Sequence, residues 1–122
     1  NDTIKANLDR AETLCTSNVT NMSSLFYDNT SFNQPIGDWD TSKVTNMSHV
    51  FAGATSFNQP LNWDTSNVND MDSMFRGAIS FNQNISNWTV SNVRTYIDFA
   101  TNSALTSANA PSKNGTKFPT TK

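Results

Sequence analysis

Large apolar side chains return at fixed places along this chain, in units of about 25 residues that read almost alike. Four of them within one unit have the spacing of a single helix face: Val44, Met47, Val50 and Phe51. Residues 56–61, Ser-Phe-Asn-Gln-Pro-Leu, follow as a short extended stretch, and the proline limits any strand there to a few residues. Each unit therefore predicts one short helical turn and one short strand.

The apolar positions form columns when the units are placed under one another. The columns are Val19, Val44, Val68 and Val93; Met22, Met47, Met71 and Tyr96; Phe26, Phe51 and Phe75; Phe32, Phe57 and Phe81; Ile36, Leu61 and Ile85; and Trp39, Trp63 and Trp88. A side chain that recurs once per coil meets its own counterpart in the neighbouring coils, which is how a stacked repeat buries its core. The pattern predicts an α/β repeat solenoid with short parallel strands on one side and short helical turns on the other.

The chain divides into a cap, a set of repeats and a tail. The predicted segments are 1–15 for an N-terminal helical cap, 16–40, 41–64, 65–89 and the degenerate 90–105 for about four stacked repeats within 16–105, and 106–122 for a loose tail or linker. The cap is predicted because the apolar residues before Thr16 have helical spacing but do not fit the repeat. The tail is rich in Thr, Ser, Asn and Lys, and the alternative is an ordered tail whose Phe118 covers the last coil.

One sequence motif resembles a known family. Ser-Phe-Asn-Gln-Pro-Ile, then Trp-Asp-Thr-Ser and Val-Thr-Asn-Met, run from Ser31 to Met47, and near-complete copies lie before and after. The pattern resembles the bacterial surface-protein repeat of about 25 residues, a relative of the leucine-rich repeats, found in BspA-like and mycoplasma surface lipoproteins. The resemblance covers Leu14 to about Leu105. It implies a leucine-rich-repeat-like solenoid, export and a role in adhesion or partner binding.

Charge and composition exclude several classes of partner. The chain has 122 residues, 15% of them charged, and a formal net charge of −2, as expected of a single domain. Lys43, Arg76 and Arg94 fall at different places in the repeat, so no basic stripe forms and nucleic acid is not expected as a partner. No apolar run is long enough to span a bilayer, so direct membrane insertion is not expected either.

Catalysis and metal binding find little support in the residues available. His49 is the single histidine, and its column predicts a surface position, which argues against a catalytic triad. Asp38 and Asp40, like Asp70 and Asp72, alternate as calcium ligands can, but no glycine-bearing calcium loop follows. We therefore expect no enzyme activity, no metal and no cofactor.

Cys15 is the single cysteine, so no disulfide framework is available. We interpret Cys15 as a small buried residue under the cap; a reactive thiol or a covalent link is the alternative.

Two polar columns are the candidate ligand-binding residues. They are Asn33, Asn58 and Asn82, followed directly by Gln34, Gln59 and Gln83. Because the side chains of a strand alternate between its faces, one amide of each pair should point outward when phenylalanine points inward. The asparagines are alternatively a ladder that satisfies backbone groups, which leaves the glutamines as the better candidates for an exposed recognition surface.

The sequence therefore predicts a non-catalytic bacterial surface interaction module that mediates adhesion or protein binding. Its expected partner is a protein or glycan on another surface, its expected location is extracellular or at the cell surface, and we expect a monomer that is part of a longer chain. Two alternatives stay open. One is a structural spacer within a larger surface protein, and the other is a module that binds a polysaccharide or an ice surface.

Overall fold

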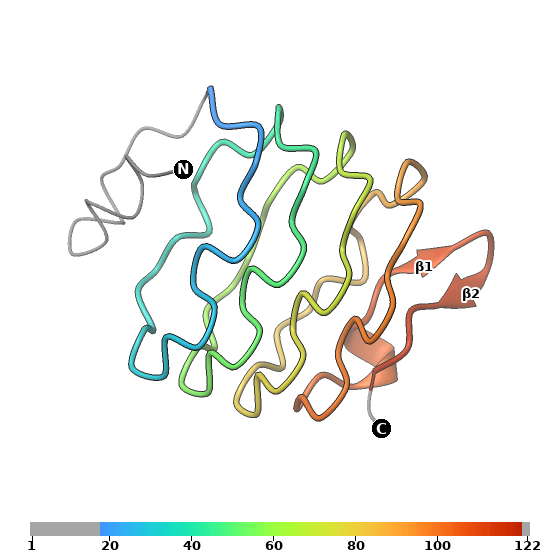
Figure 1. Ribbon diagram of the computed structural model, residues 1–122. Coiled ribbons are helices and arrows are strands. Elements are labelled where there is room, and N and C mark those ends of the chain that lie inside the picture. Colours follow the sequence, from blue (N-terminus) through green and yellow to red (C-terminus); the bar gives the residue numbers. More distant parts are fainter. Residues whose placement is uncertain (1–17, 121–122) are drawn as a thin grey trace.

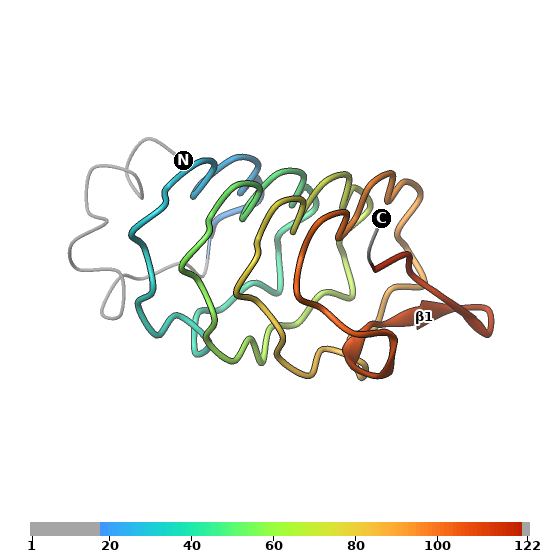
Figure 2. The same cartoon turned by 90° about the horizontal axis from the view of Figure 1, so that it is seen from below.

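The computed structural model describes residues 18–120, which wind into a stack of coils lying side by side (Figure 1). Seen from below, the coils follow one another as successive slices of one stack (Figure 2). Isolated parallel bridges join equivalent residues of neighbouring coils, namely Asn21 to Asn46, Asn46 to Asp70, and Asp70 to Thr95. The repeats are therefore stacked in register.

One side of each coil is a run of consecutive turns. We name these runs the turn segments: residues 22–29, 47–54, 71–78 and 96–103. In the second segment, the N–H groups of Val50, Ala52 and Ala54 donate to the carbonyl three residues earlier. The N–H groups of the alternate residues, Met47, His49, Phe51 and Gly53, donate at 2.8–2.9 Å to carbonyls of the next coil. Neighbouring residues thus alternate between closing a local turn and joining two coils.

The helical turn predicted for this side is wrong. His49 has a φ of 60°, and Ser24, Ser73 and Asp98 in the same column also have positive φ. A helix needs φ near −63° at every residue, so a left-handed residue inside each segment interrupts it. The spacing of Val44, Met47, Val50 and Phe51 identifies the side chains that point into the core, and all four are buried.

The parallel strands predicted for the other side are also absent from residues 18–120. The described sheet contains only β1 (Ser112–Lys113) and β2 (Thr116–Lys117), which are antiparallel. At residues 56–61 an asparagine side chain of the previous coil takes the place of a backbone acceptor, because the N–H of Asn58 donates to Oδ1 of Asn33. The predicted fold class, an α/β repeat solenoid of the leucine-rich-repeat type, is therefore contradicted. The repeats stack through turns and side-chain ladders instead.

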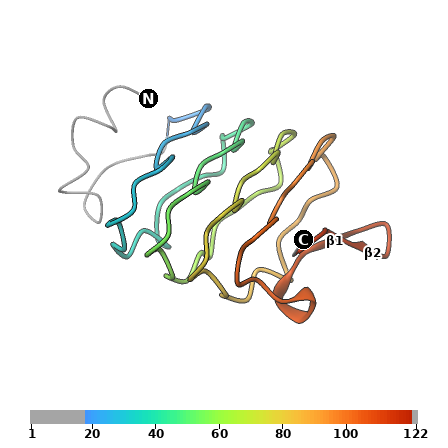
Figure 3. The same cartoon turned by 60° about the horizontal axis from the view of Figure 1, so that its bottom comes forward.

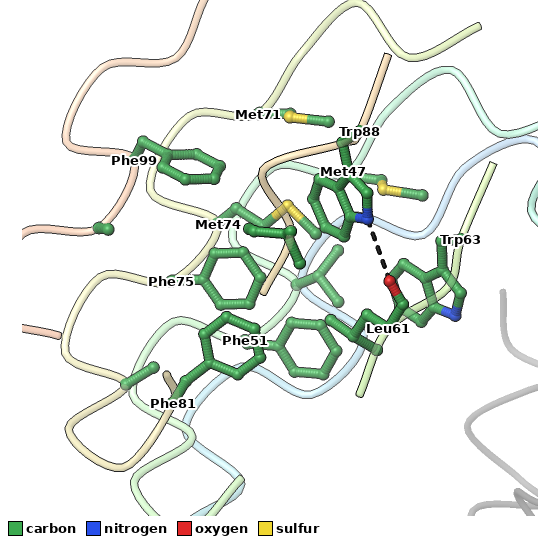
Figure 4. Packing of buried hydrophobic residues seen from close by; sticks show 14 of the residues in the cluster. Met47, Phe51, Leu61, Trp63, Met71, Met74, Phe75, Phe81, Trp88 and Phe99 are labelled. Atoms are coloured by element: carbon green, nitrogen blue, oxygen red, sulfur yellow. Dashed lines mark hydrogen bonds between the residues drawn. The ribbon is translucent and has the colours of Figure 1, made fainter. Parts of the chain in front are cut away.

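Aromatic side chains form continuous piles along the core of the stack. The ring centroids of Phe26 and Phe51 lie 5.5 Å apart, as do those of Phe51 and Phe75. The tryptophans stack in parallel, and the indole N–H groups of Trp63 and Trp88 donate to carbonyls of the preceding coil, as Trp88 does to Leu61 at 3.1 Å (Figure 4). Burying these rings supplies the main stabilisation, and the indole bonds keep their polar atoms paired.

The C-terminal end of the stack is covered by the segment expected as a loose tail or linker. It contains a short 3₁₀ helix, η2 (Ser107–Asn109), followed by the hairpin β1–β2, which extends beyond the last coil (Figure 3). The hairpin turns through an Asn-Gly pair with positive φ, the conformation that such tight turns require. Phe118 is 2% exposed and its ring stacks on Tyr96 at 4.1 Å. This arrangement corresponds to the alternative expectation, an ordered tail whose Phe118 covers the last coil.

The predicted cap at residues 1–15, with Cys15, lies outside the described residues. The division of the chain into cap, repeats and tail stays a prediction. Among the described residues, no helix is long and apolar enough to cross a membrane.

Candidate functional site

The three asparagines expected at the site form a ladder along the stack. Oδ1 of Asn33 accepts the backbone N–H of Asn58 at 2.9 Å, and Oδ1 of Asn58 accepts the N–H of Asn82 at 3.1 Å. Oδ1 of Asn82 accepts the N–H of Thr106 at 3.2 Å, so the ladder continues into the last coil. All three side chains are exposed, yet the acceptor oxygen of each is engaged within the protein.

The glutamines reach back to the same ladder. Nε2 of Gln59 donates to the backbone oxygen and Oδ1 of Asn33, each at 3.2 Å, and Nε2 of Gln83 does the same to Asn58 at 3.2 and 2.9 Å. Gln34, in the first coil, is exposed. We call these six residues the amide row. Hydrogen bonds link five of them, all but Gln34, and the binding role of the row stays a prediction.

A second candidate lies on the side of the turn segments, where sequence reasoning did not place a site. A groove of about 330 Å³ crosses the coils there, and we name it the turn-side groove. Its principal lining residues are Tyr27, Asp28, His49, Gly53, Arg76, Gly77 and Asn102. They come from all four turn segments, so only the stacking of the repeats assembles them.

Two glycines keep the turn-side groove open. Gly53 and Gly77 have φ values of 73° and 74°, and they occupy equivalent positions of neighbouring coils. A Cβ atom on Gly53 would lie 2.1 Å from Oδ1 of Asp28, so a side chain there would collide with the groove wall. The column of Asp28, Gly53, Gly77 and Asn102 holds the residue types that tolerate positive φ, and this was the available sequence signal.

The walls of the turn-side groove combine an aromatic ring with polar groups of both charges. Tyr27 is 54% exposed, and its ring meets His49 edge to face at 6.2 Å. Within residues 18–120, no hydrogen bond or ion pair engages the guanidinium of Arg76 or the imidazole of His49. These groups can therefore donate to a ligand. Apolar surface with a few convergent polar groups is the usual composition of a binding site.

The aspartates that end the first two repeats, Asp40 and Asp64, have a structural role. Oδ1 of Asp64 accepts the hydroxyl of Ser66 at 2.6 Å and its N–H at 3.0 Å, and Asp40 holds Ser42 in the same way. The serine hydroxyl, and then the serine N–H, stabilise the carboxylate and lower the pKa of both aspartates. A carboxylate held by its own turn is a poor general acid at neutral pH.

The described residues contain no group of three or more histidine, cysteine, aspartate or glutamate side chains that could hold a metal ion. The alternating pairs Asp38 and Asp40, and Asp70 and Asp72, therefore do not gain a third such ligand in this part of the chain. Oδ1 of Asp70 accepts the N–H of Asp72 at 3.0 Å, so the alternation of this second pair serves a turn.

The comparison with known families gives one match. The family model described as "Mycoplasma protein of unknown function, DUF285" matches residues 1–114. No curated protein matches the chain, and no solved structure does. The match supports a bacterial origin and the mycoplasma part of the resemblance; it gives no support to the leucine-rich-repeat part.

Proposed function

The chain belongs to this Mycoplasma family, and on that premise we propose that it is a non-catalytic surface module that binds a partner through the turn-side groove. The observation that carries the proposal is the composition of the groove. Tyr27 offers an exposed aromatic face, while Arg76 and His49 offer donors that no other described residue uses. Exposed aromatic and arginine side chains beside a concavity are the groups that most often supply binding energy.

The proposed partner is a protein or a glycan on another surface, and the proposed location is the cell surface. Both ligand classes present hydroxyl and carbonyl acceptors, which the Arg76 guanidinium can bind through several N–H groups at once. An aromatic ring beside them can pack against an apolar or sugar face. The groove is open and small, so we expect moderate affinity from one copy of the module.

A non-catalytic role agrees with the geometry at His49. Its imidazole contacts the ring of Tyr27, and no described serine, threonine or carboxylate forms a hydrogen bond with it. General-base activation of a nucleophile requires such a bond within about 3.2 Å. The histidine is therefore proposed as a contact to the ligand.

A structural spacer is the second candidate. The amide row favours it, because the exposed side of the stack is tied together by hydrogen bonds from Asn33 as far as Thr106. Such a ladder stiffens the stack by bonds within the protein.

Binding to arrays of immobilised glycans and surface proteins separates the two candidates. The groove variant carries Tyr27→Ala and Arg76→Ala, and the matched variant carries Gln34→Ala, Gln59→Ala and Gln83→Ala in the amide row. We expect the groove variant to lose binding by at least about tenfold while the amide-row variant keeps it. Loss in the amide-row variant alone would move the site to that row. A folded wild-type protein that binds nothing would favour the spacer.

A further inference from the structure

Tyr27, Ala52 and Arg76 occupy one position in three successive turn segments, and all three line the turn-side groove. Tyr27 and Arg76 are exposed, whereas the small side chain of Ala52 lies buried between them. Hydrogen-bonded neighbouring chains lie about 4.8 Å apart, so the backbones that carry the tyrosine and the arginine are about 10 Å apart. The groove therefore has a gap between an aromatic ring and a guanidinium, with space for one ring of a ligand above Ala52.

The backbone N–H groups that line the groove in its first three coils are already used. Each of them donates to a carbonyl of the same turn or of the next coil. They belong to Tyr27, Asp28, His49, Ala52, Gly53, Arg76 and Gly77. A peptide that adds a strand needs such donors in alternation with acceptors, so this mode of peptide binding is closed here. Recognition is left to the side chains.

The guanidinium of Arg76 favours a carboxylate. It is exposed, and it forms no hydrogen bond or ion pair with any residue of 18–120. Asp28 lines the same groove two coils away, and a separation of about 10 Å between exposed charges is near the screening length at physiological salt. A planar carboxylate accepts two parallel N–H bonds from one guanidinium. A phosphate monoester carries nearly two negative charges, which is more than one guanidinium balances beside Asp28.

The remaining side chains of the groove match the surface of a sugar. Tyr27 is 54% exposed, and the negative face of an aromatic ring attracts the C–H groups on the flat side of a sugar ring. Asp28 and Asn102 are both exposed, and their side-chain oxygens can accept hydrogen bonds from hydroxyl groups. An aromatic ring, hydroxyl acceptors and a free guanidinium together fit a ring that bears both hydroxyls and a carboxylate.

We propose, on the basis of the proposed function, that the turn-side groove binds an acidic sugar. The C–H face of the sugar packs on Tyr27, its carboxylate is held by Arg76, and its hydroxyls bond Asp28. Uronic acids and sialic acids share this chemistry. The groove holds one such residue, so a single module binds with modest affinity, and the affinity rises on a surface that presents many copies of the sugar.

NMR titration of the intact, isotope-labelled chain measures the binding and locates it. The probes are sialyllactose and a disaccharide that contains glucuronic acid, each beside its carboxyl-reduced form, at up to about 10 mM. The amide signals of Gly53 and Gly77 should shift with at least one acidic probe. The reduced form, in which a primary alcohol replaces the carboxylate, should bind at least about tenfold more weakly. The acidic probe that binds more tightly identifies the ligand as a sialic acid or a uronic acid.

Substitutions at Arg76 connect the carboxylate to its partner. Arg76→Gln should lower the affinity for the acidic probe about tenfold, to that of the reduced form. Arg76→Lys keeps the charge without the paired geometry and should recover only part of the loss. Lys43→Gln is the matched control, because it removes one positive charge from an exposed side chain outside the groove lining and should bind like the wild type. Thermal unfolding of each variant checks that the fold is kept.

Four results would overturn the acidic-sugar assignment, and they differ in what they leave standing. A reduced probe that binds in the groove as tightly as the acidic one shows that the carboxylate is not recognised, although the groove is still a binding site. A protein that binds through Tyr27 and Arg76, when neither sugar does, leaves the proposed function intact with another ligand. Equal losses in Lys43→Gln and Arg76→Gln show a general charge effect. If neither a sugar nor a protein binds through the groove, the proposed function fails as well.

Discussion

Oδ1 of Asn33 accepts the backbone N–H of Asn58 at 2.9 Å, a side-chain bond where a sheet would use a carbonyl. The same relation recurs between Asn58 and Asn82. The amide row therefore replaces a strand ladder on the side of the coils opposite the turn segments. Its polar pattern, which marks an exposed surface in the sequence, also holds the coils together.

Asn58→Ala should lower the free energy of unfolding by about 1 kcal/mol, because the N–H of Asn82 and Nε2 of Gln83 both lose an acceptor. Asn58→Asp keeps the oxygen that accepts these bonds and should recover most of the loss. Gln34→Ala is the control, since this exposed side chain should change stability by less than about 0.5 kcal/mol. Urea unfolding measures all three. Equal losses at positions 58 and 34 would contradict the ladder.

Gly53 and Gly77 should respond differently to alanine. Both have positive φ, so each substitution costs about 1 kcal/mol from backbone strain. At Gly53 the new Cβ atom also meets Asp28, whereas a Cβ atom at position 77 would lie 3.7 Å from the nearest backbone atom, an ordinary contact distance. Gly53→Ala should therefore lower the unfolding temperature more than Gly77→Ala, and adding Asp28→Gly should remove the difference. A double variant as unstable as Gly53→Ala would show that Asp28 is not the cause.

Thr65 and Val90 share a column and should show opposite preferences. The buried hydroxyl of Thr65 donates to the carbonyl of Thr89 at 2.8 Å, so Thr65→Val leaves that carbonyl without its donor and should cost about 1–2 kcal/mol. Val90 is the equivalent residue of the last coil, and it is buried. Val90→Thr should also destabilise the protein, because no following coil supplies a carbonyl for the hydroxyl that it buries. Chemical denaturation of both variants measures the pair. A gain in stability from Val90→Thr would contradict this reading.

Acid should weaken the fold through Asp64. The serine bonds lower the pKa of this carboxyl in the folded state, so its contribution is complete above the unfolded pKa of about 3.9 and is lost as the pH falls through the folded value. Asp64→Asn keeps an acceptor oxygen but cannot titrate; Asn84 bonds Ser86 with the same geometry. Thermal unfolding at pH 7 and at about pH 3 should therefore show a smaller acid-induced loss in the variant than in the wild type. An identical loss would exclude Asp64 as a contributor.

The periodic positions were predictable from the sequence, and the backbone between them was not. Val44, Met47 and Phe51 are buried as their spacing requires, because stacking selects inward side chains whatever the local conformation. Helical spacing cannot report the left-handed residue at His49, whose type does not demand positive φ. The glycine and asparagine column at Gly53 was the clearer signal of repeated turns.

The candidate site divides in the same way. The amide row could be found because identical residues recur in one column, and the structure shows that its members contact one another. The turn-side groove could not, because Tyr27 and Arg76 occupy one column with different chemistry and only stacking brings them together. Columns of identical residues reveal the contacts that hold neighbouring repeats together, whereas a binding surface can use the positions that vary from repeat to repeat.

Amide hydrogen exchange measured residue by residue by NMR tests the stacked-turn architecture most directly. Ser73 and Gly77 donate to the next coil, so their N–H groups should exchange slowly; Asp98 and Asn102 occupy the same columns in the last coil and should exchange fast in dilute, monomeric protein. Uniform protection along each turn segment, with helical backbone shifts through His49, would contradict the account. It would restore the helix that the apolar spacing predicted.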